Sequence, residues 1–160
     1  MSSPSKVRLT HVDEAGAARM VDVTSKDRTS REAVAEAFVR CAPETVALVR
    51  ERRAEKGDVL AVARVAGIAG AKRTPDLVPL CHPVSLTGVE IDLDVRDDGI
   101  RILATARAQD RTGVEMEAMT AVAAAALAVY DMLKAAERGI EIVGWRLVSK
   151  SGGRSGAWRR

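Results

Sequence analysis

The sequence predicts an α+β domain in which an antiparallel sheet is covered by helices on one face. The chain has 160 residues, of which 47% are hydrophobic and 29% charged, enough for one core without disulfides or a structural metal. Residues 89–95 and 100–108 alternate apolar with polar side chains, the pattern of an antiparallel hairpin. Residues 59–72 and 114–137 are instead apolar on nearly every side, the pattern of buried helices.

The first third of the chain is expected to contain a short strand and two helices. Residues 19–23 have the composition of a strand. Residues 29–32 (Thr-Ser-Arg-Glu) fit a capping box, in which the hydroxyl and the carboxylate satisfy free amides at a helix start. A helix is therefore expected over residues 33–41, with its apolar positions on one face. Pro43 would end it and begin a second helix over 44–53.

The next expected helix covers residues 59–72, and Asp58 is placed to cap its first turn. Because this helix is apolar almost all round, it must be covered on most sides. A central place in the core and a contact with another subunit would each cover it, and a share of both is expected. Residues 74–83 follow with three prolines, which exclude a helix interior or a central strand.

The second half of the chain supplies the hairpin, the long helix and a last strand. Acidic side chains of the first hairpin strand are expected to pair with Arg101 and Arg107 of the second, as solvated cross-strand pairs. The long helix over 114–137 is ended by Gly139. Residues 140–148 then form the last strand.

These elements place one α+β domain over residues 9–148. Residues 1–8 are expected to be a flexible N-terminus, and residues 149–160 a flexible, basic, glycine-rich tail. The N-terminus lacks the apolar centre of a secretory signal, so a cytoplasmic location is expected. The apolar run over 118–130 falls short of a membrane span, so no membrane partner is expected.

Composition and motifs narrow the function classes. A net charge of +3 and four aromatic residues are too little for a dedicated nucleic-acid partner, although the mild positive charge suits phosphate handling. Cys41 and Cys81 are expected to be reduced thiols. Cys81 and His82 are adjacent and lack zinc-ligand spacing, so no metal is expected. No P-loop or dinucleotide-binding fingerprint occurs.

The strongest candidates for chemistry are ionisable residues at the two ends of the long helix. Glu115 and Glu117 fall in its first turn, and Asp131 and Lys134 in its last turns. Their ordinary roles would be helix capping and a surface ion pair worth ~0.2–0.5 kcal/mol. The helix between them is rich in Ala, Val, Leu and Met, however. These charges therefore lie beside buried surface, where pKa values shift and proton transfer becomes practical.

The spacing of these candidates limits how they can share a ligand. Glu117 and Asp131 are 14 positions apart. At ~1.5 Å per residue they share a helix face but lie about 21 Å apart. If both serve one small substrate, either the helix breaks or the site combines the two ends from different subunits.

Two further candidates lie outside the long helix. Lys56 stands at a helix boundary, where exposed lysines usually do no more than solvate the surface. His82 lies between prolines in a rigid loop, and both its neutral and charged forms are accessible near pH 7. Its alternative role is that of a packed loop residue bonded to the backbone.

Several motifs together resemble one known family. They are KGDV at 56–59, PLCHP at 79–83, TGVEMEA at 112–118, YDM at 130–132 and KSGG at 150–153. In this order, within a match from about Leu9 to Gly156, they resemble cyclic pyranopterin monophosphate synthase, the molybdenum cofactor biosynthesis protein C family. A set this specific is hard to meet by chance.

The resemblance implies a ferredoxin-like α+β fold assembled as a homohexamer, a trimer of dimers, with active sites at dimer interfaces. It implies an enzyme of molybdenum cofactor (molybdopterin) biosynthesis, a phosphorus–oxygen lyase. The reaction converts (8S)-3′,8-cyclo-7,8-dihydroguanosine 5′-triphosphate into cyclic pyranopterin monophosphate and diphosphate. No resident cofactor is implied, and the sequence does not specify whether Mg²⁺ accompanies the triphosphate.

The resemblance also implies roles for individual residues, carried over by motif. Asp131 is implied to be the catalytic acid or base, with Lys56 and Lys134 beside it. The implied substrate-binding residues are Leu80, Cys81, His82, Glu115, Met116, Glu117 and Lys150. Among them, Lys150 is implied to help hold the phosphates, and His82 and Glu117 to orient the guanine-derived part.

The alternative is a non-catalytic oligomeric module that binds a phosphorylated ligand. The apolar helices over 59–72 and 114–137 would then be subunit contacts, and the lysines would hold the ligand. Release of diphosphate from the cyclised triphosphate distinguishes the two functions.

Overall fold

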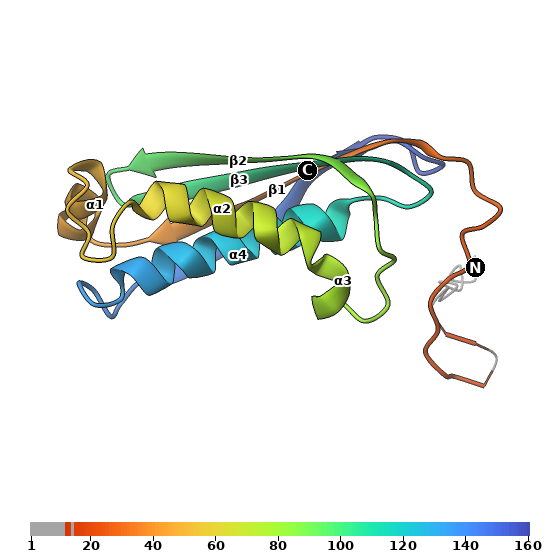
Figure 1. Cartoon of the computed structure of the whole chain (residues 1–160), viewed down its shortest axis with the longest axis horizontal. Helices are drawn as coiled ribbons and strands as arrows, with labels where there is room; N and C mark the ends of the chain where they lie inside the picture. The colour runs from red at the N-terminus through yellow and green to blue at the C-terminus, as the bar shows by residue number, and fades with distance from the viewer. Residues whose placement is uncertain (1–11, 14) are drawn as a thin grey trace, which may run out of the picture.

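In the computed structural model, which describes residues 12–13 and 15–160, a five-stranded antiparallel sheet carries two long helices on one face (Figure 1). The strands are β1 (Thr29–Arg40), β2 (Leu86–Arg96), β3 (Gly99–Asp110), β4 (Glu141–Ser151) and β5 (Trp158–Arg159). The helices are α1 (Pro43–Arg50), α2 (Val59–Lys72), α3 (Thr74–Leu77) and α4 (Glu115–Leu133). The strand order is β2-β3-β1-β4-β5. This arrangement confirms the α+β class and agrees with a ferredoxin-like fold.

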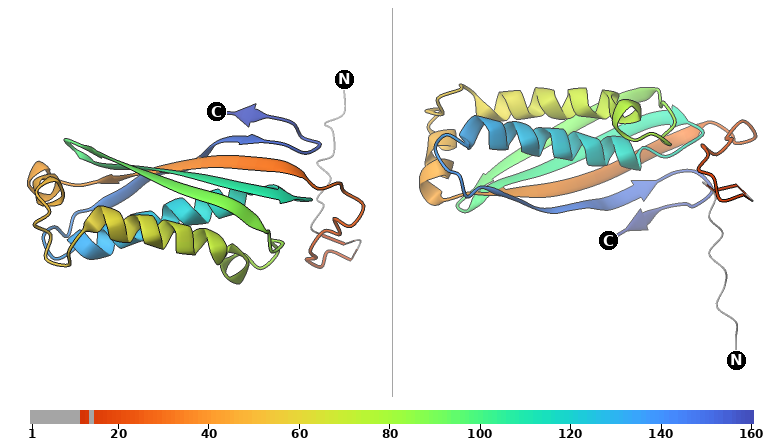
Figure 2. Two further views of the ribbon diagram at one scale, coloured as in Figure 1. Left: turned by 45° about the horizontal axis from the view of Figure 1, so that its top comes forward. Right: turned by 90° about the horizontal axis from the view of Figure 1, so that it is seen from below.

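The apolar core lies between the sheet and the layer formed by α2 and α4. Figure 2 shows these two helices side by side beneath the strands, with the opposite face of the sheet bare of helices. The helix pair also contacts the central strands β1 and β3 through α4. Because α4 runs along the length of the sheet, its two ends lie toward opposite ends of the molecule (Figure 2).

The prediction of a helix over residues 33–41 is wrong, because residues 33–40 belong to the central strand β1 and Cys41 follows its end. Ala33, Ala35, Ala37 and Val39 are all buried, and the residues between them are less so, which is a period of two. The apolar positions fit both a helix and a strand. Pairing with β3 on one side and β4 on the other settles the outcome, because tertiary context overrides local propensity.

Two other expectations for the N-terminal part are also wrong. The capping box at 29–32 does not form, since the Thr29 Oγ1 atom is buried with no hydrogen-bond partner among the described residues. Residues 19–23 form no strand; only an isolated bridge between Val12 and Ala18 lies near them. The flexible segment expected over residues 1–8 lies outside the described residues.

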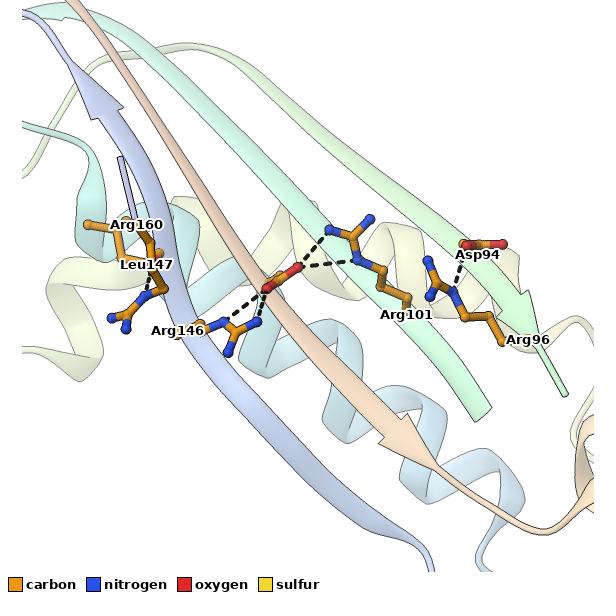
Figure 3. A network of polar contacts seen from close by, with 7 residues as sticks. Asp94, Arg96, Arg101, Arg146, Leu147 and Arg160 are labelled. Atoms are coloured by element: carbon orange, nitrogen blue, oxygen red, sulfur yellow. Dashed lines mark hydrogen bonds and ion pairs between the residues drawn. The ribbon is translucent and has the colours of Figure 1, made fainter. Parts of the chain in front are cut away.

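The expected hairpin is confirmed as β2 and β3, and its charges lie on the bare face of the sheet. Arg107 pairs with Glu90 of β2 at 3.1 Å and with Glu32 of β1 at 2.7 Å. Arg101 instead pairs with Glu36 of β1, at 2.6 Å, and Arg146 of β4 binds the same carboxylate at 2.7 Å. Figure 3 shows Arg101 and Arg146 reaching toward the strand between them. Hydrogen bonds from the guanidinium groups lower the pKa of Glu36.

The helix α2 has the predicted bounds, and the Ala61 N–H donates to Asp58 Oδ1 at 2.9 Å as a cap. Its small residues make room for neighbours within the chain. A Cβ built on Gly67 would lie 2.8 Å from Ile91 Cδ1, and one on Gly70 would lie 2.5 Å from Ala124 Cβ. Packing in the core thus covers the side of α2 that carries Gly67 and Gly70. On its outer side, Val65 is 67% exposed.

The remaining helices differ from expectation mainly at their ends. α1 begins at Pro43 as predicted and ends at Arg50. The proline-rich segment contains the one-turn helix α3, in which Pro75 occupies the first turn, where it costs no hydrogen bond. α4 ends at Leu133 rather than at residue 137.

α4 is, among the described residues, the only helix long and apolar enough to cross a membrane, with 19 residues and a mean hydropathy of 1.4. Half of this stretch is buried inside the fold. Length and composition alone are weak support for a span, since the core helix of a soluble protein meets the same criteria. Its packing against α2 and the sheet identifies α4 as a core helix.

The basic C-terminal segment, expected to be a flexible tail from residue 149, carries regular structure instead. β4 continues to Ser151, and β5 returns along it with Lys150 opposite Trp158. The Arg160 guanidinium also donates to the Leu147 carbonyl at 3.2 Å (Figure 3). Lys150 is therefore held on a strand rather than on a loose tail.

Candidate active site

The unbroken helix α4 divides the predicted site residues into two groups at its opposite ends. Glu117 lies in the first turn and Asp131 in the last full turn, 14 positions later. At ~1.5 Å per residue the two lie about 21 Å apart, as the sequence indicated. We call the group of Asp131, Lys56 and Lys134 the Asp131 cluster, and the group of Glu117, Cys81 and His82 the Glu117 cluster.

In the Asp131 cluster, one carboxylate binds two lysines. Lys56 Nζ donates to Asp131 Oδ2 at 2.7 Å and to the Asp131 carbonyl at 3.0 Å. Lys134 Nζ lies 2.7 Å from Asp131 Oδ1. Lys134 lies three residues after Asp131, whereas Lys56 comes from the loop before α2, which lies beside α4. The fold thus joins residues that are 75 positions apart in the chain.

The Asp131 cluster is open to solvent, and its ion pairs shift the pKa values of Asp131 and Lys134. The side chains of Lys56, Asp131 and Lys134 are 45%, 53% and 52% exposed. Hydrogen bonds from Lys134 and then from Lys56 lower the pKa of Asp131 to about 2. The same contact with Asp131 raises the pKa of Lys134. At neutral pH the cluster therefore holds an ionised carboxylate and a protonated Lys134.

The Glu117 cluster is buried, and one of its oxygens has no partner. Glu117 is only 1% exposed. Its Oε1 atom lies 3.8 Å from Cys81 Sγ, but among the described residues nothing binds Oε2. Desolvation raises the pKa of Glu117. An unsatisfied buried carboxyl oxygen is rare in a folded protein and fits a ligand group that the chain itself does not supply.

Cys81 and His82 bring the proline-rich loop against the start of α4. Desolvation and the neighbouring Glu117 carboxylate raise the pKa of Cys81 to about 11, so the sulfur stays a thiol at neutral pH. His82 Nε2 lies 2.6 Å from the carbonyl of Val21. A carbonyl only accepts, so this contact assigns a hydrogen to Nε2. The remaining nitrogen, Nδ1, is left for another interaction.

Two of the expected binding residues make no polar contact in these clusters. Leu80 is partly buried directly before Cys81. Met116 lies between the two glutamates of the first turn, and its side chain is 40% exposed. Both are apolar residues directly next in the chain to members of the Glu117 cluster.

A pocket of about 450 Å³ lies beside the first turn of α4. Lys150 Nζ binds Glu115 Oε1 at 2.8 Å in its wall. Five cationic side chains and three carboxylates line the pocket. The cations are Lys26, Arg31, Arg111, Lys150 and Arg154, and we call this cavity the cationic pocket.

Sequence reasoning missed every cation of this pocket except Lys150. Lys26 lies between the strand expected over 19–23 and the capping box expected over 29–32, and Arg31 lies within that capping box. Reading residues 29–40 as a strand beside the hairpin would have brought Arg31 to the edge where β3 ends and α4 begins. Basic residues lie on either side of Thr29, and they are the feature of the sequence that could have indicated an anion-binding pocket here.

The described residues contain no group of three or more His, Cys, Asp or Glu side chains that could hold a metal ion. The donors of the cationic pocket are instead nitrogen atoms that suit an anion. The arrangement offers cations for an anionic ligand in the pocket and, at separate positions, a buried carboxyl group and an exposed carboxylate between two lysines.

Comparison with known proteins shows the family of this chain. The model of the MoaC family matches residues 20–153, a range that contains all the predicted site residues. The chain belongs to the MoaC family. Its membership confirms the resemblance drawn from the motifs.

Individual MoaC relatives are similar over nearly the whole chain. A protein of Streptomyces avermitilis is 59% identical over 157 residues, which are 98% of this chain and 92% of the relative. A protein of Streptomyces coelicolor is 60% identical over 96% of this chain and 90% of its own length. One of Thermomicrobium roseum is 61% identical over 95% and 93%. All three are named cyclic pyranopterin monophosphate synthase.

Proposed function

We propose that this protein is a cyclic pyranopterin monophosphate synthase of molybdenum cofactor biosynthesis. It is a lyase that converts (8S)-3′,8-cyclo-7,8-dihydroguanosine 5′-triphosphate into cyclic pyranopterin monophosphate and diphosphate. The observation that carries the proposal is the close similarity, about 60% identity, to relatives with this name over a range that includes both clusters. The geometry of the clusters supports it further.

The cationic pocket suits the triphosphate. Lys26, Arg31, Arg111 and Arg154 form no ion pair with any carboxylate among the described residues, so their charge is available to a ligand. Lys150 is paired with Glu115 and can shift toward a phosphate of higher charge. Arginine and lysine bind phosphate oxygens through charge-assisted hydrogen bonds.

The Glu117 cluster suits the guanine-derived part of the substrate. A guanine-type ring presents adjacent N–H donors, and the free Oε2 of Glu117 is an acceptor two residues along α4 from Glu115, which lines the pocket. His82 is fixed on Val21 through Nε2 and leaves Nδ1 for a further hydrogen bond. Leu80 and Met116 supply apolar surface for the ring.

The Asp131 cluster suits the proton transfers that ring opening and rebuilding require. With a pKa of about 2, Asp131 is too weak a base while both lysines bind it. A polyanionic substrate attracts Lys56 and Lys134 away from Asp131, which raises the pKa of the carboxylate and frees it to accept a proton. Asp131 then acts as acid or base, and the lysines act as proton carriers and charge neutralisers.

The final step forms the cyclic phosphate. A substrate hydroxyl oxygen attacks the α-phosphorus, the bond from the α-phosphorus to the bridging oxygen breaks, and diphosphate leaves with that oxygen. The hydroxyl proton passes to a base, and the cations of the pocket neutralise the charge that develops on diphosphate.

We further propose that each site is shared between two copies. The separation of about 21 Å along an unbroken helix keeps one small molecule from touching both clusters of one chain. A homo-oligomer, in our proposal a trimer of dimers, brings the Asp131 cluster of one copy to the Glu117 cluster of another. The protein works in the cytoplasm without a resident cofactor, with Mg²⁺ accompanying the triphosphate if it is needed.

Incubation of the purified protein with the cyclised triphosphate tests the function. We expect release of one diphosphate per substrate, measured by a coupled assay, with formation of the cyclic phosphate followed by mass spectrometry. Tight binding of the substrate without diphosphate release would instead establish a non-catalytic binding module.

A further inference from the structure

The guanidinium of Arg31 is held at the wall of the cationic pocket by backbone oxygens. Its Nε donates to the Asp110 carbonyl at 3.2 Å, and its Nη2 donates to the Arg111 carbonyl at 3.3 Å. Within the described part of the chain no carboxylate pairs with it. Its full charge is therefore kept, while two of its donors are fixed in direction.

The turn after β4 lies directly against this guanidinium. Gly152 and Gly153 have φ angles of +94° and +74°, in the left-handed region that favours glycine. A Cβ built on Gly153 would overlap the guanidinium nitrogen Nη1 of Arg31 and lie 2.5 Å from its Cζ. The space that a side chain would fill at position 153 is thus the space that the guanidinium occupies.

The neighbouring glycines differ from Gly153 in an informative way. A Cβ on Gly152 would overlap the Ser30 carbonyl oxygen, which belongs to the backbone of β1. Gly156, with φ of +66°, lies later in the same segment and has nothing within 4 Å of its Cβ position. Among these three glycines of the C-terminal segment, only Gly153 makes room for the charged end of a side chain; Gly152 approaches the Cδ of Arg31 instead, at 3.2 Å.

We propose that Gly153 is a positioning residue for polyphosphate binding: its lack of a side chain lets Arg31 keep the orientation in which its charge faces the cationic pocket. This inference rests on the proposed function only for the identity of the anion. It deepens that function by assigning a task to the glycine-rich turn that follows Lys150.

The physical reason is preorganisation. An arginine side chain that is free to rotate loses conformational freedom when it binds, and that loss weakens the complex. Arg31, fixed on two carbonyls and covered by Gly153, has already lost this freedom. Displacing its guanidinium from the carbonyls should weaken the binding of a polyphosphate on the order of tenfold.

Gly153→Ala, with Gly156→Ala as the matched control, tests the proposal. Both changes add one methyl group at a left-handed position, so the backbone strain and the loss of thermal stability should be similar. Inorganic diphosphate, titrated calorimetrically, is the probe. We expect about tenfold weaker binding for Gly153→Ala and less than about twofold change for Gly156→Ala. Equal binding by the two variants would overturn the proposal.

A double variant separates positioning from a general effect on the turn. If Gly153 acts through Arg31, then Gly153→Ala should cause no further loss in an Arg31→Ala background. An additive loss would show that the turn contributes independently of Arg31 and would contradict the inference. In the enzymatic assay Gly153→Ala should raise KM by more than it lowers kcat, because a displaced Arg31 weakens binding of the triphosphate while the other four cations of the pocket still neutralise charge on the leaving diphosphate.

Three further outcomes bear on the proposal. If Gly153→Ala does not fold, Arg31→Lys replaces it, since lysine keeps the charge but cannot bind both carbonyls; diphosphate binding equal to that of the parent protein would overturn the proposal. If the parent protein does not bind diphosphate, the positioning role fails with the pocket assignment. Diphosphate binding without turnover of the cyclised triphosphate would instead refute the proposed function and leave the role of Gly153 intact.

Discussion

The two ends of α4 show how one helix creates opposite environments for carboxyl groups. At its start, Glu117 is 1% exposed, has an oxygen without a partner in the described chain, and has a raised pKa. At its end, Asp131 is 53% exposed, binds two lysines and has a pKa lowered to about 2. Burial dominates at the first site and hydrogen-bonded cations at the second.

The difference assigns different tasks to the two ends. A buried acceptor that lacks a partner recognises a donor and excludes water, whereas an exposed carboxylate between two lysines exchanges protons once a ligand disturbs it. In the proposed function, recognition and proton transfer are therefore assigned to groups about 21 Å apart along α4 of one chain. The following experiments test that separation, from the largest expected effect to the smallest.

Asp131→Asn should abolish proton transfer and leave recognition intact. We expect turnover to fall by roughly 10²–10⁴-fold, the usual contribution of a general acid or base, while the substrate dissociation constant changes little. Steady-state release of diphosphate and equilibrium binding measure the two quantities.

Asp97→Asn is the matched control for this change. Asp97 is another exposed carboxylate in an ion pair, 2.8 Å from Arg50, but it lies in the β2–β3 turn. Its turnover should equal that of the parent protein. Near-normal turnover in Asp131→Asn would refute the catalytic role of the Asp131 cluster.

Mixing inactive chains tests whether the two ends work together across copies. Lys56→Ala removes a residue of the Asp131 cluster and His82→Ala one of the Glu117 cluster, so each variant alone should be nearly inactive. After co-refolding in equal amounts, about a quarter of the sites of randomly paired dimers should contain neither change, and activity should return to about that fraction.

A mixture of Lys56→Ala and Asp131→Asn chains is the control for this experiment. Both changes lie in the same cluster, so every shared site contains one of them and no activity should return. Recovery in neither mixture, with mixed oligomers confirmed by native mass spectrometry, would place the whole site within one copy.

Glu117→Gln should raise stability at neutral pH, in contrast to the usual effect of a core substitution. Burial raises the folded-state pKa of Glu117 above its ordinary value of 4.5. Ionisation therefore costs stability as the pH rises above that value, and an amide avoids this cost. We expect a thermal midpoint a few degrees higher at pH 7, and no such difference near pH 4.

Thermal unfolding from pH 4 to pH 8 measures this effect, with Glu90→Gln on the surface as the control. The control should shift the midpoint little at any pH, because Glu90 is 63% exposed. A Glu117→Gln midpoint that stays parallel to that of the parent protein across this range would contradict the raised pKa. Asp131 has the opposite sign: its contribution is complete above its ordinary value of 3.8 and disappears as the pH falls through about 2.

Elements with one dominant local signal could be predicted from the sequence. The bounds of α2 follow from Asp58 and an unbroken apolar run, and the hairpin follows from strict alternation. The helix predicted over residues 33–41 was wrong, because the alanines and valines of this segment satisfy both a helical and a strand period. This segment forms a strand because β3 and β4 hydrogen-bond to its two edges.

The candidate site also has features that the sequence predicts and features that only tertiary packing creates. The sequence by itself determined the ionisable residues at the two ends of α4 and, through the constant rise of a helix, the distance between them. Only the tertiary structure decided that Lys56 reaches Asp131 across 75 positions and that Arg31 joins Lys150 in one pocket. The reason is physical: helical spacing is fixed locally by the backbone, whereas pocket membership and burial depend on which distant segments pack together.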